Sequence, residues 1–451
     1  MMDMSSQMSR FLIACIIAVG AFSMAWVWLT MTQALLVGSI TLLVALWTNE
    51  ALPMGAVSLL PIIMFPGFGI IDTKTTAFGY ANPIVFLFLG GFMLAIAVEK
   101  SGLHRWMAHH LLELFPSNAK GVIFALALTS ALLSSVLSNT TTTLLMISMG
   151  LFLSDIPKIQ VRYLLAIAYG ASVGGVITPI GTAPNLILLG LLSEHSLPAI
   201  PFVEWIMLVA PMALLMLIIM SWILGFGLEN EPSQATESYP PLSVPQKKVL
   251  ILLVGLMSVL LLNAPIQPYW DGLGLAEEGV MLGFGLILFA PKMNLLDWEE
   301  DRAKIPFRIM FLFGAGFAIA RAFSDTGLAD LTAHSLGSLG SLSPWLILLA
   351  VAALITFTTE ITSNTALISV MLPVIYSFTI QNHLDPILFM MVATIASSYA
   401  FMLPIATPPN AIVMSSGIMN VKEMARYGFI LNIVGIVLIV LFATFYWRYV
   451  I

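Results

Sequence analysis

The sequence predicts an all-α polytopic membrane protein, and three observations support this fold class. Lys, Arg, Asp and Glu together make up 9% of the 451 residues, against about 25% in an ordinary soluble domain. Apolar residues make up 59% of the chain and the mean hydropathy is +1.00, which leaves too little polar surface to cover a soluble globule. Apolar runs such as residues 11–29 and 430–445 are long enough to cross a bilayer. A soluble protein of this size is therefore excluded.

Eleven membrane crossings are expected. The first, near residues 11–30, is expected to be a retained helix, because its apolar run is longer than that of a signal peptide and only Arg10 precedes it. Further crossings are expected as single apolar segments at 33–48, 51–66, 83–99, 203–227, 247–263, 278–291, 306–323 and 424–447. Two more, 160–195 and 385–418, are interrupted by Pro179 and Pro404.

Two apolar segments of another kind lie between the crossings. Residues 119–154 and 343–379 are each broken in the middle by Ser-Asn-Thr. Non-helical backbone is tolerated at membrane depth only where it is buried in protein or lines a polar cavity. We therefore expect two re-entrant hairpins, each of which enters and leaves on one side of the membrane.

The basic residues predict the orientation. With a cytoplasmic N-terminus and an external C-terminus, only Lys74 and Arg448 lie outside, and Arg321 lies near the outer end of a span. The strong excess of basic residues inside agrees with the positive-inside rule. The residues placed inside are Arg10, Lys100, Arg105, Lys120, Lys158, Arg162, Lys247, Lys248, Lys292, Arg302, Lys304, Arg308, Lys422 and Arg426.

The two halves of the chain repeat, on either side of a Glu/Pro/Ser-rich cytoplasmic linker at 229–246. Adding 225 to the residue number carries the Ser-Asn-Thr at 138–140 onto the one at 363–365, and Pro179 onto Pro404. The same shift carries Thr182 onto Thr407. Five crossings per half place the second copy upside down in the membrane, so we expect inverted repeats, which are common in secondary transporters.

The paired motifs predict an anion site with adjoining cation sites. Each Ser-Asn-Thr supplies hydroxyl and amide groups at the N-terminus of a half-helix, which carries about +0.5 charge and unpaired N–H groups. The Pro-broken segments 178–185 and 403–410 expose carbonyl groups, which suit Na⁺. Neither tip contains Lys or Arg, so a bound dianion needs further positive charge, and co-bound Na⁺ would supply it. One Ser-Asn-Thr alone would be read as a helix cap; two copies at one offset favour the functional interpretation.

Other readings have less support. The chain has no metal-ligand spacing, phosphate loop or nucleophile motif and one cysteine, so we predict no enzyme activity, no nucleic-acid binding and no cofactor besides sodium. Glu360 could orient the second hairpin, bind a proton or join an ion pair. Residues 104–112, rich in histidine, are expected to form an amphipathic interfacial helix. We expect four aromatic residues to be interface anchors, namely Trp26, Trp28, Trp447 and Tyr449.

The second half carries a long pattern that resembles a known family. It reads Ser397-Ser398-x-x-Phe401-x-x-Pro404-Ile405-Ala406-x-x-x-Asn410-x-Ile412-Val413. Together with the paired Ser-Asn-Thr tips, it is similar to the divalent anion/sodium symporter family, over nearly the whole chain. The resemblance implies a homodimer in an inner membrane that works by an elevator motion. It implies a scaffold domain (11–115 and 247–338) and a mobile transport domain (117–228 and 340–451).

The resemblance also assigns the site. The implied substrate contacts are Ser138, Asn139, Thr140, Ser363, Asn364, Thr365, Thr407 and Pro408. Thr182 is a less supported contact, because Ala183 stands where the second half has Pro408. The implied ligands of one sodium ion are Ser134, Ser138, Asn139 and Gly181, and those of the other are Thr359, Thr362, Asn364 and Ala406.

The resulting functional prediction is a sodium-coupled symporter of C4-dicarboxylates such as succinate, malate and fumarate. Thr at both tips favours dicarboxylates over sulfate among relatives of this kind. Three alternatives stay open: a sodium-independent antiporter that exchanges citrate or tartrate for succinate, a sulfate symporter, and, from a different class, an anion channel.

Overall fold

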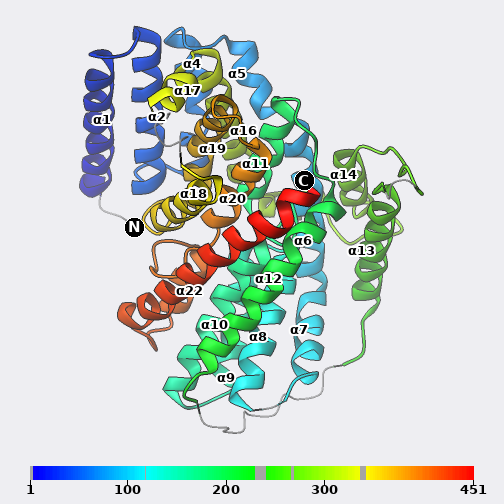
Figure 1. The fold of residues 1–451 in the computed structure, drawn as a ribbon. Coiled ribbons are helices and arrows are strands. Elements are labelled where there is room, and N and C mark those ends of the chain that lie inside the picture. Colours follow the sequence, from blue (N-terminus) through cyan, green and yellow to red (C-terminus); the bar gives the residue numbers. More distant parts are fainter. Residues whose placement is uncertain (1–3, 117, 229–239, 266–268, 336–341) are drawn as a thin grey trace.

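The computed structural model describes residues 4–116, 118–228, 240–265, 269–335 and 342–451, and in these ranges it contains helices and no β-strand. Within these ranges, eight helical segments are long and apolar enough to cross a membrane. In Figure 1, α1 and α2 lie side by side at one edge of the molecule, and α13 and α14 lie at another. The all-helical prediction is confirmed in the described ranges, and the protein is a multi-pass membrane protein.

The helices of the first half run from the N-terminus to the linker. They are α1 (Met4–Trp26), α2 (Met31–Asn49), α3 (Met54–Val57), α4 (Leu60–Gly67), α5 (Thr73–Tyr80), α6 (Pro83–Ser101), α7 (Leu103–Glu113), α8 (Ala119–Ser134), α9 (Asn139–Phe152), α10 (Pro157–Gly175), α11 (Ala183–Glu194) and α12 (Phe202–Gly225).

The helices of the second half follow the linker. They are α13 (Val244–Asn263), α14 (Glu277–Ile287), α15 (Trp298–Asp301), a 3₁₀ turn (Arg302–Lys304), α16 (Phe307–Asp325), α17 (Leu328–Ser335), α18 (Pro344–Thr359), α19 (Asn364–Gln381), α20 (Pro386–Ser397), α21 (Pro408–Met414), α22 (Val421–Phe442), a π-helical turn (Ala443–Trp447) and α23 (Arg448–Val450).

Two predicted crossings are not single full-length helices. Residues 51–66 form two short helices, α3 and α4, with Pro61 at the start of the second. Helix α14 has 11 residues, which span only about 16 Å of a hydrocarbon core about 30 Å thick. It ends four residues before Pro291. Hydropathy marks these segments as apolar but does not detect a break in the backbone, so the prediction of one continuous helix at each place is wrong.

The two predicted hairpins are present as pairs of helices broken at the expected positions. In the first, α8 and α9 pack against each other and are separated by residues 135–138. In the second, α18 and α19 are separated by residues 360–363. Ser138 and Ser363 are the N-cap residues of α9 and α19, with extended backbone angles. The two interrupted helices are also broken as predicted, between α10 and α11 and between α20 and α21.

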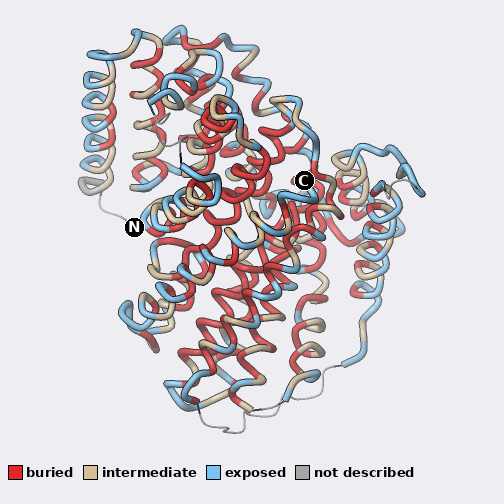
Figure 2. The backbone as a smooth tube through the Cα atoms, in the orientation of Figure 1, coloured by how far each residue is buried: buried red, intermediate tan, exposed pale blue. Residues whose placement is uncertain are grey.

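The buried core runs through helices from both halves. Helix α10 is buried on nearly every side, and Figure 2 shows this buried region continuing through the lower and central helices while α1 is mostly exposed. Arg162 of α10 donates a hydrogen bond to Leu224 O at 2.9 Å and lies 4.2 Å from the ring centroid of Tyr427. Thus α10, α12 and α22 form one packed unit that joins both repeats.

Trp447 contradicts the interface-anchor prediction. Its side chain is fully buried, and its Nε1 donates a hydrogen bond to Leu208 O at 2.9 Å. Trp26 and Trp28 are exposed, as an anchor requires. Trp447 lies in the π-helical turn after α22, where it packs against α12, and a contact between distant helices has no local sequence signal.

Ion pairs join the end of α6 to α15, just before α16. Lys100 Nζ lies 2.6 Å from Asp301 Oδ2, and Lys304 Nζ lies 2.9 Å from Asp301 Oδ1. Burial alone would raise the pKa of Asp301, but the hydrogen bonds from Lys100 and Lys304 outweigh it and lower that pKa to about 2. The carboxylate is therefore ionised at physiological pH, and it fixes the end of α6 next to α15.

The predicted domain boundaries fall partly outside the described residues. Position 117, the junction at 338–340 and residues 229–239 of the linker all lie there. The described end of the linker includes Ser243, which caps α13 in a capping box with Gln246.

Candidate functional site

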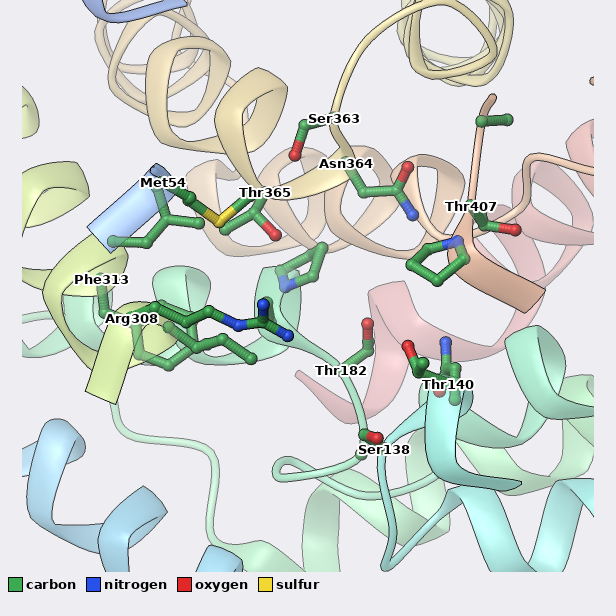
Figure 3. Close-up of a pocket in the computed structure, with 18 of the residues that line it drawn as sticks. Met54, Ser138, Thr140, Thr182, Arg308, Phe313, Ser363, Asn364, Thr365 and Thr407 are labelled. Atoms are coloured by element: carbon green, nitrogen blue, oxygen red, sulfur yellow. The ribbon is translucent and has the colours of Figure 1, made fainter. Parts of the chain in front are cut away.

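The two hairpin tips and the two helix breaks meet around one cavity of about 590 Å³. This size falls within the usual range for small-molecule sites, about 300–1,000 Å³. Residues 138–140 and 363–365 line it, together with residues 180–184 and 404–408. Most of the remaining lining comes from α2, α3, α6 and α16, and the rest from residues next to the tips, the second break and the end of α2 (Figure 3). The sequence repeat thus brings its four polar segments to one place.

The first tip joins a hydroxyl to an amide. Ser134 Oγ donates a hydrogen bond to Asn139 Oδ1 at 2.6 Å. A side chain at Gly175 would place its Cβ 2.6 Å from the same Oδ1, so glycine there lets α10 approach the tip closely. The Ser138 hydroxyl accepts a hydrogen bond from Thr141 N at 3.1 Å. Ser138 therefore has a structural role, as the N-cap of α9, that does not depend on a bound ligand.

The second tip repeats the hydroxyl–amide pair. Thr359 Oγ1 lies 2.6 Å from Asn364 Oδ1 and 3.0 Å from Ser397 O. Ser363, in contrast to Ser138, makes no capping hydrogen bond with its side chain. In the first tip the Ser138 hydroxyl also donates to Thr141 Oγ1 at 2.9 Å, and the corresponding Ala366 has no hydroxyl to accept such a bond from Ser363.

Two buried asparagines hold the helix breaks open. Asn185 Nδ2 donates to Gly175 O at 3.2 Å and to Thr178 O at 2.8 Å. Asn410 Nδ2 donates to Ala400 O and Leu403 O, both at 3.0 Å. These carbonyl groups come from corresponding positions, and Thr178 O and Leu403 O also accept backbone hydrogen bonds from Gly181 N at 3.3 Å and Ala406 N at 3.2 Å. The sequence motif contained both asparagines but gave them no role, and their reach back across the break shows what they do.

Glu360 braces the second break. Its carboxylate accepts hydrogen bonds from Met402 N at 2.9 Å, Leu403 N at 3.0 Å and Asn432 Nδ2 at 2.7 Å. The side chain is buried, and within the described ranges it makes no ion pair. Of the three roles left open for Glu360, the structure supports orientation of the hairpin against the unwound segment.

The two threonines that precede the second half-helices differ in their surroundings. Thr182 is half-buried and makes no capping bond with its side chain, so its hydroxyl is free to face the cavity. Thr407 is 4% exposed, and its Oγ1 accepts a hydrogen bond from Asn410 N at 3.4 Å. Pro408, the first residue of α21, is exposed to the cavity. The less supported of the two predicted threonine contacts therefore has the freer hydroxyl.

The remaining predicted sodium ligands are placed less uniformly. Gly181 and Ala406 line the cavity within the two breaks. A Cβ on Gly181 would lie 2.4 Å from Gly175 O, so this break is folded tightly onto the end of α10. Thr362 also lines the cavity, but its hydroxyl donates to Thr358 O at 2.9 Å, along its own hairpin.

Arg308 lines the cavity too, and the sequence reasoning missed it. It is the second residue of α16, and Figure 3 shows its guanidinium pointing into the space between Thr365 and Thr182. The sequence predicts that Arg308 is one of the basic residues on the cytoplasmic side, and it does not predict a role for Arg308 in the cavity. Its position at the start of an apolar helix, after Ile305-Pro306, was the available signal.

The geometry suits an anion with adjacent small cations. Helices α9, α11, α19 and α21 all begin at residues that line the cavity, and helix N-termini attract negative charge. The hydroxyl, amide and carbonyl oxygens of the tips and breaks are hard, uncharged ligands of the kind that alkali cations prefer. Both chemistries lie within one cavity.

Comparison with known proteins relates the chain to membrane transporters. A family model described as a citrate transporter (CitMHS) matches residues 42–394. The sodium-dependent dicarboxylate transporter SdcS of Staphylococcus saprophyticus is 31% identical over 442 residues, covering 90% of this chain and 85% of that protein. SdcS of Staphylococcus aureus (strain bovine RF122) is 31% identical over 438 residues, covering 89% and 84%. The crystal structure of the Alcanivorax borkumensis YdaH transporter has a TM-score of 0.62 at 17% identity, covering 92% of this chain and 99% of that one, a likeness of fold.

Proposed function

The chain belongs to the citrate transporter (CitMHS) family, and from this premise we propose that it is a sodium-coupled symporter of C4-dicarboxylates such as succinate, malate and fumarate. The family membership makes it a membrane transporter, and the resemblance to divalent anion/sodium symporters predicted from the sequence is confirmed. The names of the SdcS relatives support both the dicarboxylate and the sodium dependence.

The observation that carries the proposal is the matched hydroxyl–amide pair in each half. Ser134–Asn139 and Thr359–Asn364 have the same oxygen–oxygen distance, 2.6 Å, although they lie 225 residues apart. Each pair lies beside a broken helix, and its asparagine is the first residue of a half-helix, α9 or α19, whose N-terminus faces the cavity. Each asparagine can therefore offer its oxygen to a cation and its remaining amide group to an anion.

The charges at the two tips support the proposed coupling. The tips provide partial positive charge from helix N-termini but no Lys or Arg. A dianion bound there is better stabilised when sodium occupies the neighbouring sites, and each sodium is better stabilised by the dianion. Mutual stabilisation of this kind makes the empty and the fully loaded forms the favoured ones, which is what symport requires.

The proposed transport cycle is an elevator motion in a homodimer. The scaffold comprises residues 11–115 and 247–338, and the transport domain comprises 117–228 and 340–451. The packing of α10, α12 and α22 through Arg162 supports a transport domain that moves as one body. The N-terminus is proposed to be cytoplasmic and the C-terminus external, in a bacterial-type inner membrane.

Proteoliposomes test the proposed function. We expect uptake of labelled succinate when an inward sodium gradient is applied and none when choline replaces sodium. Uptake in choline that depends on internal succinate or citrate would instead establish an exchanger. Currents far above carrier turnover, with no sodium stoichiometry, would establish a channel. Competition by malate, fumarate, citrate and sulfate then ranks the substrates.

A further inference from the structure

Arg308 lies at the edge of the proposed anion site and has no charged partner among the described residues. The lining of the cavity, within the described ranges, contains two charged side chains, Arg308 and Glu50. Arg308 is exposed and makes no hydrogen bond or ion pair with any described residue, Glu50 included. It lies in the first turn of α16, where the helix dipole disfavours positive charge. An anion close to the guanidinium would relieve this unfavourable arrangement.

The backbone at Arg308 is held by the scaffold helices. A Cβ on Gly55 of α3 would lie 3.2 Å from Arg308 Cβ, so glycine at this position lets α3 pack closely against the base of Arg308. Helices α3 and α16 are both in the proposed scaffold, whereas Thr182 and Thr365 belong to the proposed transport domain. Arg308 therefore faces the tips from the opposite side of the domain boundary (Figure 3).

We propose that Arg308 is a side-specific anion contact, which binds a carboxylate of the bound anion in the described conformation and loses it when the transport domain moves. The planar guanidinium is suited to a carboxylate, with two parallel N–H groups. The inference rests on the proposed function, because it requires an anionic cargo and a moving transport domain. It adds that the two sides of the membrane differ in affinity, and that this difference grows with the charge of the anion.

The predicted orientation identifies the side of the membrane on which Arg308 contacts the anion. The N-terminal end of α16 lies a few residues after Arg302 and Lys304, and these residues are placed on the cytoplasmic side. Arg308 should therefore lower the KM for substrate presented from the cytoplasm and leave the KM for external substrate unchanged. An exposed ion pair is weak, so we expect Arg308→Gln to raise the cytoplasmic KM for succinate about threefold to fivefold. Citrate, with a third carboxylate, should show a larger ratio.

The experiment measures transport in inside-out and right-side-out membrane vesicles at constant sodium. Arg308→Gln is compared with wild type and with Arg302→Gln, which removes the same charge from a residue that does not line the cavity. Arg308→Lys keeps the charge and should retain most of the cytoplasmic affinity. Added choline chloride should reduce the wild-type advantage, because salt screens an exposed charge. Arg308→Met replaces the glutamine variant if that variant does not insert stably.

The results separate the two proposals. A rise in KM on one side only, absent from Arg302→Gln and reduced by salt, supports the role of Arg308. An unchanged KM on both sides, or an equal rise on both, overturns it while leaving the symporter intact. If wild type moves no dicarboxylate, the proposed function fails. Thermal stabilisation of the purified protein by citrate and succinate then tests Arg308 alone, and equal stabilisation of wild type and Arg308→Gln overturns its role as an anion contact.

Discussion

The two halves of this protein build the same site elements from different neighbours. In the first half Ser134 pairs with Asn139, and in the second Thr359 pairs with Asn364, at the same distance of 2.6 Å. Asn185 and Asn410 hold the two breaks with hydrogen bonds to corresponding carbonyl groups. The hydrogen bonds that shape the two tips and the two breaks are therefore close to symmetric, as the proposed pair of cation sites and shared anion site would lead us to expect.

The halves differ in how each break is braced. In the first, the Thr178 hydroxyl donates one hydrogen bond to Ser135 O. In the second, Glu360, at the position of Ser135, accepts three hydrogen bonds, one of them from Asn432 of α22. The position that corresponds to Asn432 is Met207, which cannot donate such a bond. The symmetry of the site is thus kept while the support behind it has diverged.

The largest expected effect tests the symmetry itself. Asn139→Ala and Asn364→Ala each remove an amide that we propose binds both a cation and the anion, so each should lower sodium-driven succinate uptake at least about a hundredfold. Both variants should elute as the wild-type oligomer and unfold at a similar temperature. Normal uptake by either one would contradict the proposed site, and a large effect at only one of them would show that the two halves are not functionally equivalent.

The second prediction tests the difference in bracing. Glu360→Gln places an amide where the backbone N–H of Met402 or Leu403 needs an acceptor, which should cost about 2–4 kcal/mol of stability. Thr178→Val removes one hydroxyl and keeps a side chain of similar size, so it should lower the stability by about 1 kcal/mol. Thermal unfolding in detergent, with and without sodium, measures both. Equal losses would show that the extra hydrogen bonds of Glu360 add nothing to the second half.

The third prediction separates sodium binding from anion binding. Ser134→Ala and Thr359→Val remove the hydroxyl partner of each asparagine but leave the amide. Each should raise the sodium concentration needed for half-maximal uptake by roughly tenfold, about 1.4 kcal/mol. The maximal rate at saturating sodium should change little. Ser148→Ala, which removes an exposed hydroxyl in α9 outside the cavity, provides the control, and a rise in sodium requirement there would remove the specificity of the result.

The sequence predicted the features that depend on local pattern and on the repeat. The Ser-Asn-Thr breaks and the proline breaks follow from residues close together in the chain, and their correspondence follows from the repeat at an offset of 225. The structure places the breaks as expected. The partners of Glu360 could not be predicted, because Asn432 lies 72 residues away and has no counterpart in the first half. Arg308 was missed for a similar reason: the position that corresponds to it is Pro83, so the repeat gives no indication of a charge in the cavity.

The smallest expected effects come from the two threonines, and they are also the most informative about the substrate. Thr182 has a free hydroxyl at the cavity, so Thr182→Val should raise the succinate KM about threefold to tenfold through the loss of one hydrogen bond to a charged group, with little change in stability. Thr407 caps α21, so Thr407→Val should lower stability by about 1 kcal/mol and affect KM less. Uptake kinetics and thermal unfolding of the two variants together show which threonine contacts the substrate and which caps a helix. If Thr407→Val raised KM more than Thr182→Val, the anion would lie against the second half, and the free hydroxyl of Thr182 would not mark its binding position.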